Sequence, residues 1–147
     1  MTRNMLFAAV ALSVAVCPAL ATAARAGSPI EGNWINPKRS VTVRIAPCGA
    51  NWCGRVVSAS ADAKAKAAAG GTARLVGTQL MTDLRATGEG SWRGSIFVPD
   101  RNVRAEGEVR LIGPRTLEVE GCAMSGILCK SQQWTRAGAA PKARARR

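Results

Sequence analysis

The segment 91-SWRGSIFVPDRNVRAEGEVRLIGPRTLEVEG-121 decides the fold class of this chain. Three runs within it alternate apolar or small residues with polar ones, which is the pattern of strands with one buried face. Two turn signals separate the runs, Pro99 to Asn102 and Gly113-Pro114-Arg115. The segment therefore predicts three consecutive antiparallel strands joined by tight turns.

The flanking sequence continues this pattern. Val41 to Ile45 alternates apolar and polar residues, and a turn from Pro47 to Asn51 precedes a returning strand at 54–57. Further strands are expected near Gly32, at 78–84 and at 131–136. About eight short strands predict an all-β fold, either a sandwich or a small antiparallel β-barrel. A closed barrel of this size is either packed inside or holds one small ligand.

Only residues 60–69 favour a helix. Ser60 can cap it, alanine and lysine fill it, and Gly70-Gly71 ends it. The segment has little apolar bulk, so we expect one short helix on the surface.

Residues 1–26 have the order of a secretory signal peptide. Arg3 provides the positive start, and the apolar run from Met5 to Val16 is shorter than the roughly 20 residues that span a bilayer. Small residues follow, and we expect cleavage between Ala21 and Gly27. No second apolar span follows, so the mature protein is expected to be periplasmic or secreted and not membrane-spanning.

Two other interpretations of this segment are weaker. A buried N-terminal helix would show caps and amphipathic spacing, which are missing. Cys17 raises the alternative of a lipid-modified N-terminus, but Val16 stands where such sites carry a small residue. We therefore divide the chain into a signal peptide (1–26), a β-barrel domain (27–136) and a basic tail (137–147).

Four cysteines remain after cleavage, and an even number in an exported chain indicates disulfides. The spacing favours Cys48–Cys53 and Cys122–Cys129, because each pair flanks one short loop. The alternative is a zinc site, which usually has tighter C-x2-C spacing and needs free thiolates. We predict two disulfides and no metal.

The chain is strongly basic, with a net charge of +12. Without Arg3 and Arg25 the mature chain keeps 19 Lys/Arg against 9 Asp/Glu, which gives +10. Four of these positive charges lie in the tail at 137–147, which is too rich in Ala, Pro and Arg to pack. Such a charge suits an anionic envelope component as partner, or it only promotes solubility. No basic motif interleaved with aromatic residues indicates nucleic-acid binding.

The residue types present argue against catalysis. The chain has no histidine and no tyrosine, which removes Ser-His-Asp and Cys-His arrangements and histidine metal sites. A pair of carboxylates remains formally available. However, four of the acids alternate with apolar residues in strands and are expected on a solvated face: Glu106, Glu108, Glu118 and Glu120. We predict no catalytic residue and no cofactor.

Gly32-x-Trp34 near the start and Trp134-Thr135-Arg136 at the end resemble lipocalin-like barrels, in which an arginine of the last strand stacks on the first tryptophan and closes the barrel. Trp34 and Arg136 are the corresponding pair here. Further matching motifs are Ile45-Ala46-Pro47-Cys48-Gly49, Cys53-Gly54-Arg55-Val56, Gly77-x-x-Leu80-Met81, Trp92-x-Gly94-x-Ile96-Phe97-x-Pro99, Leu117-x-Val119-x-Gly121-Cys122 and Leu128-Cys129-Lys130-x-Gln132-x-Trp134.

Together these motifs resemble the bacterial domain-of-unknown-function family 2147 over residues 30–136. The resemblance implies an exported, lipocalin-like barrel and no catalytic residues. The chain departs from the family pattern in the Ala/Lys helix at 61–69 and in the turn Phe97-Val98-Pro99-Asp100.

Two functions are compatible with such a barrel. The first is a non-catalytic binding module for a small apolar or amphipathic envelope ligand, and small residues on presumed inner faces favour space for one: Gly94, Ala105, Gly107 and Gly121. The second is a protein-interaction module, such as an inhibitor of a secreted or periplasmic hydrolase. Its candidate loop carries Met124, Ile127 and Leu128 between two cysteines, although the same loop could instead plug the barrel.

Overall fold

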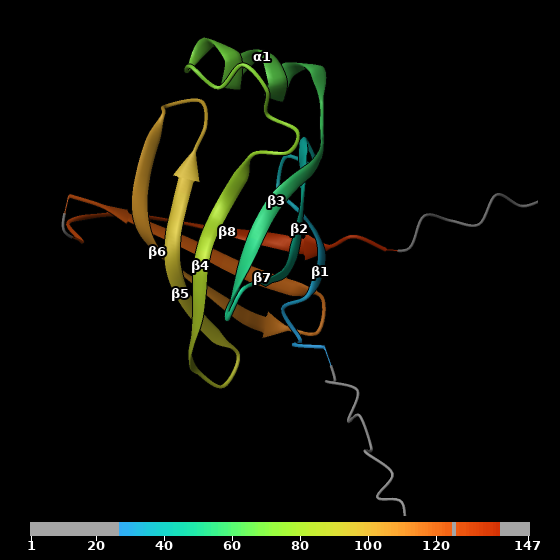
Figure 1. Cartoon of the computed structure of the whole chain (residues 1–147), viewed down its shortest axis with the longest axis vertical. Helices are drawn as coiled ribbons and strands as arrows, with labels where there is room; N and C mark the ends of the chain where they lie inside the picture. Colours follow the sequence, from blue (N-terminus) through green and yellow to red (C-terminus); the bar gives the residue numbers. More distant parts are fainter. Residues whose placement is uncertain (1–26, 125, 139–147) are drawn as a thin grey trace, which may run out of the picture.

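The computed structural model describes residues 27–124 and 126–138, which form one antiparallel barrel (Figure 1). The expected signal peptide and most of the expected tail lie outside these residues. The elements in chain order are β1 (Gly32–Ile35), β2 (Val41–Cys48), β3 (Asn51–Ala59), α1 (Ala61–Ala69), β4 (Gln79–Gly88), β5 (Ser91–Val98), β6 (Val103–Gly113), β7 (Thr116–Ala123) and β8 (Leu128–Arg136). Each strand pairs with its neighbour in sequence, and β1 pairs with β8. The predicted eight-stranded barrel with one helix is confirmed.

The deciding segment folds as its pattern predicts. β5, β6 and β7 pair through Trp92↔Val109 and Val109↔Val119, and these three side chains are buried on the inner face. The glutamates at alternate positions point outward because successive strand residues face opposite sides. Pro99 to Asn102 forms the turn between β5 and β6.

The helix α1 lies across one end of the barrel, at the top of Figure 1. The Ser60 hydroxyl accepts a hydrogen bond from the Ala63 amide at 3.1 Å and caps its first turn. Ala67 packs into the core and is only 2% exposed. Gly70 lies so close to the β5–β6 turn that a Cβ there would be 2.4 Å from the Asp100 carbonyl oxygen. The helix is therefore anchored to the barrel by one face while its other face meets solvent.

The core fills the interior of the barrel and reaches Ala67 of α1. Its fully buried side chains include Ile30, Trp34, Ile45, Met81 and Leu84. Two of the glycines expected to leave space do not. A Cβ at Gly94 would be 2.5 Å from the Thr82 carbonyl oxygen, and one at Gly107 would be 2.1 Å from Ile96 Cγ1. These glycines allow close packing, whereas a Cβ at Gly121 would meet nothing within 4 Å.

The junction between β1 and β8 is much shorter than the others. It contains only the pairs Trp34↔Arg136 and Ile35↔Thr135. By contrast, β7 and β8 pair continuously from Thr116↔Thr135 to Ala123↔Leu128. Residues 128–133 of β8 therefore have a strand partner on one side only within the described parts of the chain.

Candidate functional site

An open cleft of about 800 Å³ lies where the barrel wall is incomplete. It is bounded by α1, by the turn between β1 and β2, by the β5–β6 turn and by β8. Its floor is apolar and consists of Val41, Ala67, Leu75 and Leu80. Its rim is polar and includes Lys38, Asp62, Lys66, Asp100, Gln132 and Gln133. Such a surface offers burial to an apolar group and hydrogen bonds to a polar one.

The cleft follows from the lengths of the elements around it. β1 has four residues and turns away at Asn36, so it leaves most of β8 uncovered. The Asn36 side-chain oxygen accepts hydrogen bonds from the amides of Ser40 and Val41, at 2.8 and 3.0 Å, and fixes this turn. On the opposite side α1 covers the barrel end without reaching β8.

Charges on the helix side of the rim are paired. Lys66 and Asp62 form an i,i+4 ion pair at 2.8 Å. The hydrogen bond that the Lys66 ammonium donates to Asp62, and then the charge of that carboxylate, raises the pKa of Lys66 above its usual value. Both side chains are mostly exposed, so the pair contributes little to stability. The rim therefore presents both signs of charge rather than one strong field.

The β7–β8 hairpin extends beyond the other strands, at the left of Figure 1. Cys122 and Cys129 are opposite one another in the strand register and are disulfide-bonded. Beyond this bond, Met124, Ile127 and Leu128 are 72%, 82% and 56% exposed. The loop is thus not a barrel plug, and its apolar side chains face solvent.

The second disulfide joins Cys48 to Cys53 across the β2–β3 turn. Both bonds follow the pairing that the sequence spacing favours. Glu120 lies close to the two sulfurs of the hairpin disulfide. Because those sulfurs are bonded to each other, they are not the thiolates that a zinc site requires.

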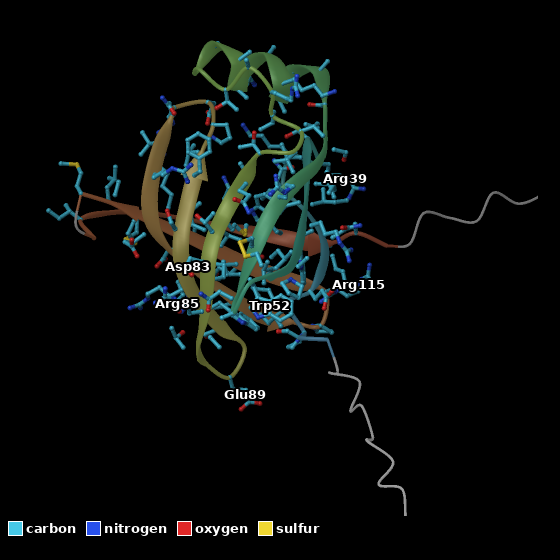
Figure 2. The ribbon with its side chains drawn as sticks, in the orientation of Figure 1. Arg39, Trp52, Asp83, Arg85, Glu89 and Arg115 are labelled. Carbon is cyan, nitrogen blue, oxygen red and sulfur yellow. A yellow bond between two sulfur atoms is a disulfide. The ribbon has the colours of Figure 1, made fainter. Side chains whose placement is uncertain are left out.

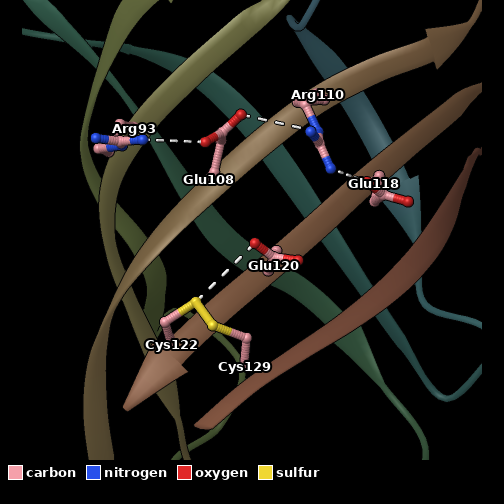
Figure 3. A network of polar contacts seen from close by, with 7 residues as sticks. All are labelled: Arg93, Glu108, Arg110, Glu118, Glu120, Cys122 and Cys129. Carbon is pink, nitrogen blue, oxygen red and sulfur yellow. Dashed lines mark hydrogen bonds and ion pairs between the residues drawn. A yellow bond between two sulfur atoms is a disulfide. The ribbon is translucent and has the colours of Figure 1, made fainter. Parts of the chain in front are cut away.

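Glu108 of β6 and Glu118 of β7 lie on the outer wall and form ion pairs with arginines (Figure 3). Glu108 pairs with Arg93 at 3.2 Å and with Arg110 at 3.8 Å. Arg110 also donates a hydrogen bond to Glu118, which is the main cause of a raised Arg110 pKa. Another outer ion pair joins Asp83 and Arg85 of β4 at 2.7 Å (Figure 2). These carboxylates do not line the cleft.

Trp34 and Arg136 meet where β1 closes against β8. The Arg136 guanidinium lies 4.2 Å from the centre of the Trp34 ring and donates to the carbonyls of Glu31 and Pro29 at 2.8 and 2.7 Å. The Trp34 indole donates to the Ile30 carbonyl at 2.9 Å. A Cβ at Gly32 would be only 2.5 Å from Arg136 Nη1. The Gly-x-Trp motif therefore makes room for the arginine.

An eight-stranded antiparallel barrel closed by a stacked tryptophan–arginine pair, with an open cleft beside β8, is a lipocalin-like fold. A solved structure described as "Protein HP1028 from the human pathogen Helicobacter pylori belongs to the lipocalin family" matches 74% of this chain and 83% of that chain, with a TM-score of 0.56 and 14% identity. This similarity is one of fold.

Residues 32–136 match the model of the family DUF2147, described as "Uncharacterized protein conserved in bacteria", and the chain belongs to that family. The search of curated proteins found no match. No helix among the described residues is long and apolar enough to cross a membrane. The two disulfides are consistent with an extracytoplasmic protein.

The hairpin loop and the Trp34–Arg136 pair could be predicted from the sequence, whereas the cleft was not predicted. The cleft combines Leu75, Leu80 and Ala67 with β8 residues more than fifty positions away. No local pattern marks them as one surface. The signal that could have indicated the cleft was the short first strand, because β1 is too short to pair along the whole of β8.

Proposed function

We propose that this protein is a non-catalytic binding module that holds a small amphipathic molecule in the cleft beside β8. The observation that carries the proposal is the cleft's combination of an apolar floor and a polar rim. Its volume of about 800 Å³ lies within the range of small-molecule sites, roughly 300–1,000 Å³. The apolar part of the ligand would contact Leu75 and Leu80, and its polar part would meet Gln132 or Lys38.

Several features favour binding over chemistry. The chain contains no histidine, and none of the glutamates of β6 and β7 lines the cleft. The lipocalin-like fold is one in which a barrel commonly holds one small ligand. The proposed place of action is the periplasm or the medium, after cleavage between Ala21 and Gly27. N-terminal sequencing of protein from those compartments tests the export; an uncleaved cytoplasmic chain would refute it.

The direct test is native mass spectrometry of protein purified from its own envelope. Wild-type protein should carry an adduct of small-molecule size. Ala63→Trp should remove it, because Ala63 is half-buried and lines the cleft. Ala65→Trp is the matched control, since Ala65 lies on the same helix but is exposed and outside the cleft. Equal adducts on both variants would place the ligand elsewhere.

The exposed hairpin tip favours a second candidate function, a protein-interaction module such as an inhibitor of a secreted or periplasmic hydrolase. Ile127 is 82% exposed, and the disulfide at the hairpin base cross-links the two strands that carry the tip. An apolar loop of this kind can enter a partner's pocket with little loss of entropy. Inhibition assays against envelope hydrolases, comparing wild type with Ile127→Glu, test this function. Equal inhibition by both proteins would argue against the tip.

A further inference from the structure

The free edge of β8 is the most unusual feature of this barrel outside the cleft floor. Each of the six residues from Leu128 to Gln133 is exposed. Barrels normally leave no unpaired edge, because closure satisfies the backbone of every strand. Here β1 closes only the last two residues of β8. About 20 Å of strand edge therefore stays open at roughly 3.4 Å per residue.

The direction of individual amides along this edge follows from two hydrogen bonds. The Arg136 amide donates to the Arg115 carbonyl on the β7 side, and the Ala137 amide donates to the Asn33 carbonyl on the β1 side. Successive amides of a strand point to opposite sides, and the β7–β8 register has no shift. The amides of Cys129, Ser131 and Gln133 therefore point toward the open side, away from β7.

The free edge of β8 also carries a positive charge, at Lys130. Lys130 lies opposite Gly121 in the register, and a Cβ at Gly121 would meet nothing within 4 Å. Lys130 is exposed and makes no ion pair among the described residues. An added strand would place one of its residues opposite Lys130, and a carboxylate there would supply the missing counter-charge.

We propose that β8 binds an extended, acidic segment of a partner protein by strand addition along residues 128–133. A row of outward amides and carbonyls recognises another backbone, and alternate side chains of the added strand then face the inner or the outer surface. The disulfide at one end of the edge and the Trp34–Arg136 contact at the other hold β8 in place before binding.

A second copy of this chain fits the free edge of β8 less well than an acidic segment of a partner does. The free edge, Leu128-Cys129-Lys130-Ser131-Gln132-Gln133, contains no acid. Pairing two such edges would bring Lys130 opposite an amide or another lysine. A lysine on an edge strand is a common means of preventing association between identical edges.

The test uses capped eight-residue peptides that alternate valine and threonine and carry glutamate, glutamine or lysine at one central position. Hydrogen exchange of the protein's amides is measured with each peptide at millimolar concentration. The glutamate peptide should slow exchange at Cys129, Ser131 and Gln133 by about tenfold. No slowing with any of the three peptides would overturn the proposal.

Two variants make the test specific. Ser131→Pro removes an outward amide without removing a bond to β7, so the fold should persist while peptide binding is lost. Ser131→Ala keeps that amide and should bind normally. Lys130→Glu should weaken binding of the glutamate peptide by about fivefold and strengthen binding of the lysine peptide.

Binding that survives Ser131→Pro would refute strand addition. Light scattering covers the alternative occupant: a concentration-dependent dimer that Ser131→Pro abolishes would assign the edge to a second copy instead. Ser131, Gln132 and Gln133 also line the cleft, and Ala63→Trp separates the two proposals. This variant fills the cleft beside α1 and should leave exchange protection by the peptide at Ser131 unchanged.

Discussion

Gly32 is the residue whose identity is most tightly constrained at the closed end of the barrel. It adopts a φ of 138°, which residues with a side chain rarely adopt, and a Cβ would be 2.5 Å from Arg136 Nη1. We predict that Gly32→Ala lowers the free energy of unfolding by about 2 kcal/mol, through backbone strain and displacement of the guanidinium.

Urea denaturation measures this loss. Gly121→Ala is the control, because a Cβ there meets nothing within 4 Å and its φ is not positive. The control should change stability by less than about 0.5 kcal/mol. Equal losses for both variants would argue that the constraint at Gly32 is not specific.

Trp34 and Arg136 should act as one structural unit. Trp34 is fully buried, so Trp34→Ala should cost about 3–5 kcal/mol through the cavity that it leaves. Arg136→Ala should cost less, through loss of stacking and of two carbonyl contacts. Thermal melts of the single and double variants give the coupling energy, which we expect to exceed about 0.5 kcal/mol. Additive losses would mean that the two residues are energetically independent.

Among the elements, the β7–β8 hairpin depends most on a covalent bond. Its tip makes few contacts with the rest of the barrel, and the Cys122–Cys129 disulfide joins its two strands near the exposed residues. We predict that the double variant Cys122→Ser/Cys129→Ser loses about 2–3 kcal/mol of stability, as expected for closure of a short loop.

Peptide mapping without reducing agent checks the bonds themselves. It should recover Cys48 linked to Cys53 and Cys122 linked to Cys129. A peptide that links one hairpin to the other, or one zinc ion per chain, would contradict the predicted pairing.

The elements also show where sequence reasoning succeeds and where it stops. The alternation in β5 to β7 reports a face that is buried along most of its length, so those strands could be predicted. The same alternation runs through β8, yet Lys130 and Gln132 on its inner-facing side are exposed. Whether an inward position is covered depends on the length of β1 and the reach of α1, which no local pattern in β8 records.

The glycines on inner faces predicted internal space poorly, because the structure around each glycine decides whether space remains. A small residue on an inner face leaves a void only if its neighbours fail to approach. At Gly107 the side chain of Ile96 fills the position, whereas Gly121 lies beside the uncovered part of β8 and keeps open space. The sequence shows that a glycine has no side chain, but it does not show which neighbouring atoms occupy the space.

On the scale of the whole molecule, the excess of positive charge should promote association with anionic surfaces. The chain carries +12 in total, and four basic residues follow Gly138. We predict that deleting 139–147, which keeps the Ala137 amide bonded to the Asn33 carbonyl, weakens binding to anionic vesicles at low salt and leaves the thermal stability unchanged. Exposed charges act over about 8–10 Å at ordinary salt, so high salt should abolish the difference.

Vesicle co-sedimentation of full-length and truncated protein measures this effect, with neutral vesicles as the control. If truncation changes nothing at low salt, the tail does not contribute to surface attraction. The charge would then serve solubility alone.

If the cleft beside β8 binds a small amphipathic molecule, an NMR titration with laurate should detect it. Laurate has an apolar chain for Leu75 and Leu80 and a carboxylate for the polar rim. We predict saturable binding, with shifts concentrated at Val41, Leu75, Leu80 and Gln132, that Ala63→Trp abolishes and Ala65→Trp retains. Absence of saturable binding, or shifts of the same residues in both variants, would contradict the account.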